Sequence, residues 1–409
     1  MNFVCFSTLT VPKNTAQAFT ACRFYSALAQ AGCRVHLVTF EQPEELAPDI
    51  CAELLDSRIE VIRIPFKPPR NVRIWERFRN RSTVDYHWWD STSLAARDKV
   101  AEVLRKVDQP VLISRSYPLE SHLTVYDIRR EARLWIPHFS DPWPIPLKAV
   151  IDDLNSGALA RIRYRYNMAM VRKIIRESGF VTVTCRNAIR YFSETYRGVS
   201  ADRFHVCQHI GSPPLKSAGF QADKEPGSFN IVHTGGLAYD RYPGPLVREF
   251  SQAAEKWPQL RLTLYGRIEN LNTDSARHPW LRLMKDSLAD PRVATDLIRQ
   301  SDMNLVVDTE TILPYSPFLA SKFAYAVGAG RPLLGVGESD SAMARLRDEF
   351  GSTYFADITK HGELADLLLK IRDEHRPIPT PNPSLQDRFF ATTVIGEFLN
   401  RVRSVFNNS

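Results

Sequence analysis

Short apolar runs alternate with amphipathic stretches of helical periodicity along the whole chain of 409 residues. A first series of such runs lies at residues 2–7, 34–40, 59–65, 111–116, 134–139, 180–185 and 204–209. A second series follows at residues 229–234, 262–266, 304–308 and 332–336. Because a helix between successive strands returns the chain to the start of the sheet, this alternation predicts parallel α/β sheets.

The two series are separated by residues 211–228, which lack periodicity and are rich in proline, glycine and serine. This composition predicts an interdomain linker. We therefore expect two doubly wound, Rossmann-like α/β domains, at residues 1–212 and 213–383, that face each other across a ligand-binding cleft. Closely spaced prolines in 376–384 predict an extended segment. A helix in 385–409 should follow it and return to the first domain.

The composition restricts the class of protein. The chain has 44% hydrophobic and 24% charged residues, which is typical of a globular protein. No apolar run approaches the roughly 20 residues of a membrane-spanning helix, and the N-terminus lacks the pattern of a signal peptide. The six cysteines show no metal-ligand spacing, which indicates reduced thiols and a cytoplasmic location. The net charge of +7 favours an anionic partner.

Two loops in the second domain each follow a strand, open a helix and carry one cation. Residues 233–245 contain Arg241, and residues 314–323 contain Lys322. A cation at the electropositive start of a helix is opposed by roughly 0.3–1 kcal/mol, unless an anion binds there. The pair therefore predicts a phosphate-binding site. The alternative is that both long side chains simply extend into solvent.

The second half resembles the group-1 nucleotide-sugar glycosyltransferases, which have the GT-B architecture. The matching stretches are 231–253, 260–267, 297–308 and, most specifically, SPFLASKFAYAVGAGRPLLG at 316–335. Weaker matches in the first half lie at 113–123, 137–143 and 181–192. The resemblance implies transfer of a sugar from a nucleotide-diphosphate donor, of UDP or GDP type, to a glycan or lipid-linked acceptor. It also implies a retaining reaction without a metal or other cofactor, in surface polysaccharide assembly.

The resemblance assigns roles to individual positions. Arg241 and Lys322 would clamp the donor diphosphate and stabilise it as the leaving group. The backbone of Phe318 and Leu319 would face the donor phosphate or sugar. The other donor-binding positions implied are Gly235, Gly236, Gly266, Arg267, Leu288, Ser316, Ser321 and Tyr325, of which Leu288 would pack on the base.

The chain departs from the family pattern at several of these positions. Tyr325 stands where many relatives have a glutamate that binds ribose, and it would either hydrogen-bond ribose or belong to the core. The partner glutamate seven residues earlier is replaced near Pro317 and Phe318, and Gly236 stands where an arginine is common. A second hypothesis is therefore a protein that binds a nucleotide sugar or glycan without turnover.

On the acceptor side, His122 and Asp141 follow strands of the first domain and would orient an acceptor hydroxyl. The alternatives are a helix-surface histidine and an Asp-Pro turn. Residues 63–81 and 86–90 are basic and aromatic, which favours a lipid-diphosphate acceptor or the anionic cytoplasmic face of the inner membrane. The same composition suits a solvated helix or RNA. Because RNA binding leaves Arg241 and Lys322 unexplained, we do not expect a nucleic-acid partner. Residues 161–173 predict an exposed amphipathic helix.

Overall fold

A computed structural model of the protein describes residues 1–7, 15–41, 48–65, 91–116, 119–154, 157–211, 215–237, 241–268, 278–285, 290–374 and 378–407. The chain forms two compact units. Unit 1 comprises Met1–Gln208 together with Ala391–Ser409, and unit 2 comprises His209–Phe390. The structure thus divides the chain after 208 and again after 390, where the sequence suggested divisions after 212 and near 385.

Unit 1 is built on a parallel sheet with strand order β3-β2-β1-β4-β5-β6-β7. Its strands are β1 (Asn2–Phe6), β2 (Arg34–Phe40), β3 (Glu60–Ile64), β4 (Val111–Ser116), β5 (Leu134–Phe139), β6 (Val181–Val183) and β7 (Phe204–Val206). Its helices are α1 (Ala16–Gln30), α2 (Pro48–Leu54), α4 (Ser91–Lys106), α5 (Glu120–Tyr126), α6 (Lys148–Leu154), α7 (Ala158–Glu177), α8 (Arg186–Thr195) and α15 (Ala391–Asn407). The central strands are buried on both faces, which explains their continuous apolar sequence.

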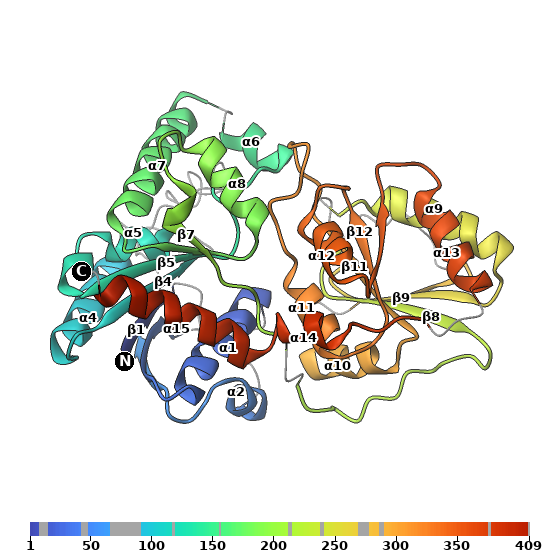
Figure 1. Ribbon diagram of the computed structural model, residues 1–409, viewed down its shortest axis with the longest axis horizontal. Helices are drawn as coiled ribbons and strands as arrows, with labels where there is room; N and C mark the ends of the chain where they lie inside the picture. Colours follow the sequence, from blue (N-terminus) through green and yellow to red (C-terminus); the bar gives the residue numbers. More distant parts are fainter. Residues whose placement is uncertain are drawn as a thin grey trace. The chain divides into compact units, whose positions relative to one another are not determined.

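The C-terminal helix α15 belongs to unit 1. In Figure 1 it lies beside α1, and the two helices pack together. The ring of Phe398 on α15 lies 5.2 Å from that of Phe24 on α1 and 6.1 Å from that of Phe3 on β1. Through Phe398, helix α15 therefore packs into the core of unit 1.

Unit 2 is a second parallel sheet with strand order β10-β9-β8-β11-β12-β13. Its strands are β8 (Phe229–Thr234), β9 (Leu260–Gly266), β10 (Leu281–Lys285), β11 (Met303–Val307), β12 (Leu333–Gly337) and β13 (Tyr354–Asp357). Its helices are α9 (Pro243–Lys256), α10 (Pro291–Gln300), α11 (Ser321–Gly328), α12 (Ala342–Phe350), α13 (Glu363–Asp373) and α14 (Pro383–Asp387). This is the strand order of a dinucleotide-binding doubly wound sheet, so the predicted Rossmann-like fold is confirmed.

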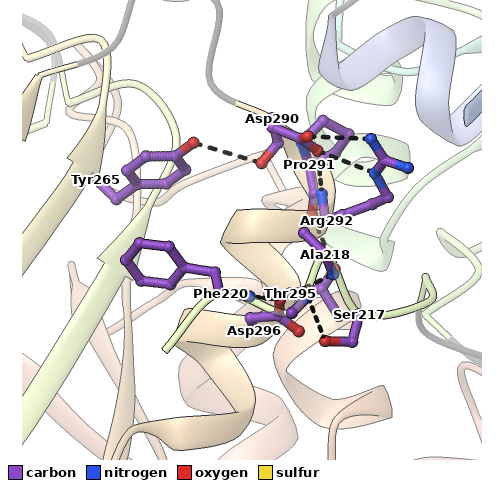
Figure 2. Close-up of polar contacts among 10 residues, drawn as sticks. Ser217, Ala218, Phe220, Tyr265, Asp290, Pro291, Arg292, Thr295 and Asp296 are labelled. Carbon is purple, nitrogen blue, oxygen red and sulfur yellow. Dashed lines mark hydrogen bonds and ion pairs between the residues drawn. The ribbon is translucent and has the colours of Figure 1, made fainter. Parts of the chain in front are cut away.

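The segment predicted as an interdomain linker is, where described, bound to unit 2. Asp296 on α10 is buried, and its Oδ2 accepts hydrogen bonds from the backbone N–H groups of Ala218 at 2.9 Å and Phe220 at 3.0 Å. One turn later, Gln300 accepts from the backbone of Ala222 at 2.7 Å and donates to the Phe220 carbonyl at 2.6 Å. Figure 2 shows residues 217–220 running alongside α10. We call residues 215–228 the strap.

Among the described residues, no helix is both long enough and apolar enough to cross a membrane.

Candidate functional site

The candidate site lies where the strand order of unit 2 reverses. β8 pairs with β9 on one side and with β11 on the other, and successive connections leave in opposite directions from this point. Doubly wound sheets bind ligands just beyond the carboxyl ends of the strands at such a switch point. β8 ends at Thr234, and β11 ends at Val307. The loops that follow these two strands contain the cations singled out in the sequence.

Two glycines bring the ends of β8 and β9 together. Gly235 has φ of +90° and Gly266 has φ of +125°, both in the region that favours glycine. The backbone N–H of Gly235 donates to the Tyr265 carbonyl at 2.6 Å. A β-carbon on Gly266 would lie 2.9 Å from the Cα of Gly235, which is too close for any side chain. The backbones at the ends of β8 and β9 are therefore in direct contact.

Lys322 lies in the first turn of α11 and extends back over the end of β8. Its Nζ donates to the carbonyl oxygen of Gly236 at 2.9 Å and lies 3.4 Å from Nε2 of His233. A β-carbon on Gly235 would come within 2.7 Å of its Cε, so the lysine stem uses the space that this glycine leaves open. Lys322 is therefore packed and hydrogen-bonded at the switch point.

Arg241 reaches the same place from the start of α9. Its Nη1 donates to the carbonyl oxygen of Val307, the last residue of β11, at 2.7 Å. The guanidinium is partly buried and held at the carboxyl end of the strand next to β8. The two cations thus come from the loop before α9 and from the first turn of α11, and they are fixed at the ends of adjacent strands.

His233 is a buried ring on which the charges of both Lys322 and Arg241 act. The imidazole is fully buried on β8, and its Nδ1 lies 3.0 Å from the carbonyl oxygen of Leu305 on β11. Burial, followed by the charges of Lys322 and Arg241, lowers the pKa of His233 well below its usual range. Both positive charges therefore act on one buried ring, and that ring is neutral at physiological pH.

The helix starts beside the two cations add to the positive potential. Among the described residues, no side chain caps the first turn of α11 or of α9, but Pro243 and Pro245 lack an N–H, so Gly244 alone offers one among the first three residues of α9. Uncapped backbone N–H groups at a helix start attract anions. Together with Lys322 and Arg241, they make this part of unit 2 suited to a phosphate or diphosphate group.

Carboxylates lie at the next strand ends, and the sequence reasoning missed them. Asp308 directly follows β11, and its side chain is buried. Its Oδ1 accepts from the backbone N–H of Thr309 at 2.8 Å, and the carboxylate also accepts a hydrogen bond from the hydroxyl of Ser316. Burial raises the pKa of Asp308 to about 6. Glu338 follows β12, accepts a hydrogen bond from the hydroxyl of Tyr242 at 3.0 Å, and has its pKa raised, chiefly by burial.

The signal for these missed residues is a polar side chain at the end of a continuous apolar run. His233 follows the apolar pair Ile231 and Val232, and Asp308 follows the apolar residues 305–307. The carboxyl ends of neighbouring parallel strands meet at one edge of the sheet, so both residues were bound to lie near the switch point.

The remaining predicted donor-binding residues occupy different environments. Ser316 is fully buried, and Phe318 and Leu319 are buried in the loop before α11. Ser321 begins α11, and Tyr325 lies one turn further along, partly buried. Arg267 is exposed after β9, and its carbonyl oxygen accepts from the backbone of Leu237 at 2.9 Å. Leu288 lies outside the described residues.

His122 was predicted to face an acceptor, but in the structure it is not accessible. The side chain is fully buried between β4 and β5, where Nδ1 lies 2.7 Å from the Ser114 hydroxyl. Its ring centroid lies 4.4 Å from that of Phe139, and burial lowers its pKa to about 3. A neutral imidazole enclosed in the core does not meet a substrate, since helix α5 turns it inward. Neither the expected role nor the alternative of a helix-surface residue fits this position.

Asp141 is partly exposed after β5, where it was expected. Its Oδ2 accepts a hydrogen bond from the side chain of Gln17 in the first turn of α1, at 3.1 Å. The carboxylate therefore lies at the carboxyl edge of the unit 1 sheet. The second acceptor feature, the basic and aromatic segment, falls mainly in 66–90, outside the described residues.

Comparison with known proteins identifies similar folds. Neither a protein-family model nor a curated protein sequence matches the chain. The solved structure of HepE from Anabaena with UDP and glucose is 11% identical, with a TM-score of 0.64 over 99% of this chain and 100% of that one. Sucrose-phosphate synthase from Thermosynechococcus elongatus is 14% identical, with a TM-score of 0.62 over 100% of both chains.

A TarM variant from S. aureus, solved with fondaparinux, α-GlcNAc-glycerol and UDP, is 8% identical, with a TM-score of 0.64 over 99% of both chains. At these identities the likeness shows the fold alone. The two-domain α/β fold of the GT-B type, predicted from the sequence, is thereby confirmed.

Proposed function

We propose that this protein is a glycosyltransferase that moves a sugar from a nucleotide-diphosphate donor to a hydroxyl acceptor. The observation that carries the proposal is the placement of Lys322 and Arg241 at the carboxyl ends of the adjacent strands β8 and β11, at the switch point of unit 2. Two fixed cations, with the uncapped start of α11 at Lys322, match the charge of a diphosphate. Solvated surface cations would not be held by Gly236 and Val307.

The proposed role of the two cations follows from the place where negative charge develops during sugar transfer. When the bond between the anomeric carbon and the diphosphate breaks, negative charge accumulates on the departing phosphate oxygens. Lys322 and Arg241 would stabilise that charge more strongly in the transition state than in the ground state, which lowers the barrier. With two side-chain cations in this role, the proposed reaction uses no metal. Retention at the anomeric carbon is proposed on the family resemblance alone.

The donor and setting are further parts of the proposal. HepE was solved with UDP and with UDP-glucose, so a UDP-sugar is the first donor to test on this chain. The acceptor would be a glycan or a lipid-diphosphate-linked sugar, as in surface polysaccharide assembly. Asp141, at the carboxyl edge of the unit 1 sheet, would orient the acceptor hydroxyl.

Helix α7 supports peripheral attachment to an anionic membrane from the cytoplasmic side. Its exposed face carries the basic residues Arg161, Arg165, Arg172, Lys173 and Arg176. Two large apolar side chains lie among them: Ile162 is 64% exposed and Tyr166 is 40% exposed. Basic residues attract anionic headgroups, and an exposed isoleucine gains by entering the acyl boundary but gains nothing from nucleic acid.

The test is sugar transfer or donor hydrolysis with UDP- and GDP-sugars. We expect Lys322→Ala and Arg241→Ala each to lose about 2–4 kcal/mol of transition-state stabilisation, seen as a lower kcat/KM. Lys256→Ala, on the exposed end of α9, serves as the control. Near-normal turnover in both site variants, with unfolding midpoints unchanged, would remove the basis of the proposal.

A protein that binds the donor without turnover is the second candidate. Tyr325 favours it, because a tyrosine replaces the ribose-binding glutamate that the family resemblance implies. Tight binding of UDP without hydrolysis or transfer to any acceptor would support this candidate instead.

A further inference from the structure

The position of Lys322 depends on acceptors that come from β8 and the loop after it. A lysine side chain has four rotatable bonds, so a defined position for its ammonium requires specific partners. The ammonium Nζ contacts the Gly236 carbonyl oxygen at 2.9 Å and Nε2 of His233 at 3.4 Å. The carbonyl belongs to the exposed end of a loop, whereas the imidazole is buried inside the sheet.

The hydrogen bonds of His233 determine what it offers to Lys322. A carbonyl oxygen only accepts, so the 3.0 Å contact with Leu305 requires a proton on Nδ1 of His233. In the neutral ring, Nε2 then carries a lone pair and accepts from the ammonium of Lys322. The Gly236 carbonyl oxygen, which also lies near the ring, then accepts from Lys322 and not from Nε2. The charges of Lys322 and Arg241 both act on this ring, so protonation of Nε2 would add a third positive charge to two that repel it.

We propose that His233 is a positioning residue for Lys322, whose ammonium it holds at the switch point through the lone pair of Nε2. This inference rests on the proposed function insofar as Lys322 binds the donor diphosphate. If His233 were only a polar residue packed in the core, its hydrogen bond to Leu305 would be sufficient. Such a residue would not need to direct a second acceptor, Nε2, at Lys322.

Two substitutions separate the two ring nitrogens. His233→Gln places a side-chain oxygen near the position of Nε2, so it keeps an acceptor for Lys322. His233→Asn places its amide near the position of Nδ1 and keeps only the bond to Leu305. By calorimetric titration with UDP, we expect His233→Asn to bind about tenfold more weakly than the wild type, since a hydrogen bond to a charged group is lost. His233→Gln should stay within about threefold of the wild type.

A double-mutant cycle with Lys322→Met tests whether the effect passes through Lys322. If His233 acts by positioning this lysine, His233→Asn should change UDP affinity less than about twofold when residue 322 is methionine. A purely structural histidine would weaken UDP binding equally in both backgrounds, and that result overturns the proposal. Equal losses in the Gln and Asn variants also overturn it.

A measurement on the ligand-free protein tests the contact between His233 and Lys322 independently of the proposed function. In histidine-labelled wild-type protein and in Lys322→Met, the ¹⁵N resonance of Nε2 of His233 reports its hydrogen bond. We expect this resonance to move when Lys322 is replaced, while that of buried His122 in unit 1 stays unchanged. An unmoved resonance of His233 overturns the proposal even if UDP binds. A moved resonance with no affinity for any nucleoside diphosphate upholds the positioning contact and removes the proposed function.

Discussion

At the scale of single residues, Asp308 makes unit 2 sensitive to pH. Its pKa in the folded protein is raised to about 6 by burial, against 3.8 for an unperturbed carboxyl group. Between these values the folded state binds a proton that the unfolded state releases, so the free energy of unfolding decreases as pH rises. The decrease amounts to about 2 kcal/mol between pH 4 and pH 7.

Replacement of Asp308 by asparagine should remove this pH dependence. The neutral amide has the same shape and no charge to desolvate, so Asp308→Asn should be more stable than the wild type at pH 7 and nearly equal to it at pH 4. Urea unfolding at a series of pH values measures the difference. Asp98→Asn on α4, whose carboxylate is 68% exposed, is the control and should leave the profile unchanged. Parallel profiles for the wild type and Asp308→Asn would contradict the prediction.

Single residues also show how much of the candidate site could be predicted from the sequence. Lys322 and Arg241 were predicted because a cation at a helix start conflicts with the helix dipole, a local property that the sequence contains. His233 was missed because a lone histidine in an apolar strand has the pattern of a core residue. Its contacts with Leu305 and Lys322 join segments about seventy to ninety positions apart, and only the sheet order brings them together. His122 was misplaced for the same reason, since its environment depends on Ser114 and Phe139.

At the scale of secondary structure elements, the strap depends on two side chains of α10. Asp296 is buried and binds two backbone N–H groups of the strap, so Asp296→Ala leaves both donors without their charged acceptor. We expect a loss of about 2–3 kcal/mol in the free energy of unfolding, measured in urea. New protease cleavage within 215–228 should accompany it. Arg299→Ala, exposed on the same helix, should change neither stability nor cleavage. Unaltered cleavage in Asp296→Ala would show that the strap is held by other contacts.

Strands and helices were predicted where their periodicity is continuous. β10 and β13 were missed: they are short edge strands of unit 2, and only neighbouring strands define them. The strap was assigned to a linker because proline, glycine and serine resemble an unattached segment, whereas its hydrogen bonds come from α10. The predicted final helix is divided into α14 and α15, since Arg388–Phe390 interrupt it at the boundary between the two units.

Helix α7 gives a prediction about membrane attachment. Each basic residue near an anionic surface contributes about 1 kcal/mol, so Arg161→Glu with Arg165→Glu should weaken binding to phosphatidylglycerol vesicles by at least about 2 kcal/mol. Ile162→Ser should weaken it further at high salt, where screening leaves the apolar contact. Vesicle co-sedimentation measures both effects.

The matched control for α7 is Arg97→Glu with Arg105→Glu on α4, which changes the net charge equally. Equal losses in both pairs would indicate a general charge effect rather than a docking face. Binding to RNA but not to vesicles, abolished by the α7 pair, would assign the face to nucleic acid.

At the scale of the whole molecule, the site predicts that nucleotides stabilise the fold. A ligand that binds only the folded protein adds about 2.7 kcal/mol at one hundred times its dissociation constant. In a thermal-shift panel of UDP, GDP, ADP and dTDP, we therefore expect one nucleotide to raise the midpoint in the wild type and to have little effect in Lys322→Met. Equal stabilisation of both proteins would place the nucleotide elsewhere.

Amide hydrogen exchange can identify the segments of the chain that the nucleotide stabilises. If the diphosphate binds at the switch point, UDP should slow amide hydrogen exchange in 229–237 and 316–325, because these segments end β8 and begin α11. Residues of β10 and α13, at the far edge and outer surface of the unit 2 sheet, should exchange at their original rate, and unit 1 should show smaller changes than the switch point. Lys322→Met should abolish the protection of 316–325. Protection confined to β4 and β5 of unit 1 would mean that the cations of unit 2 serve some other anion.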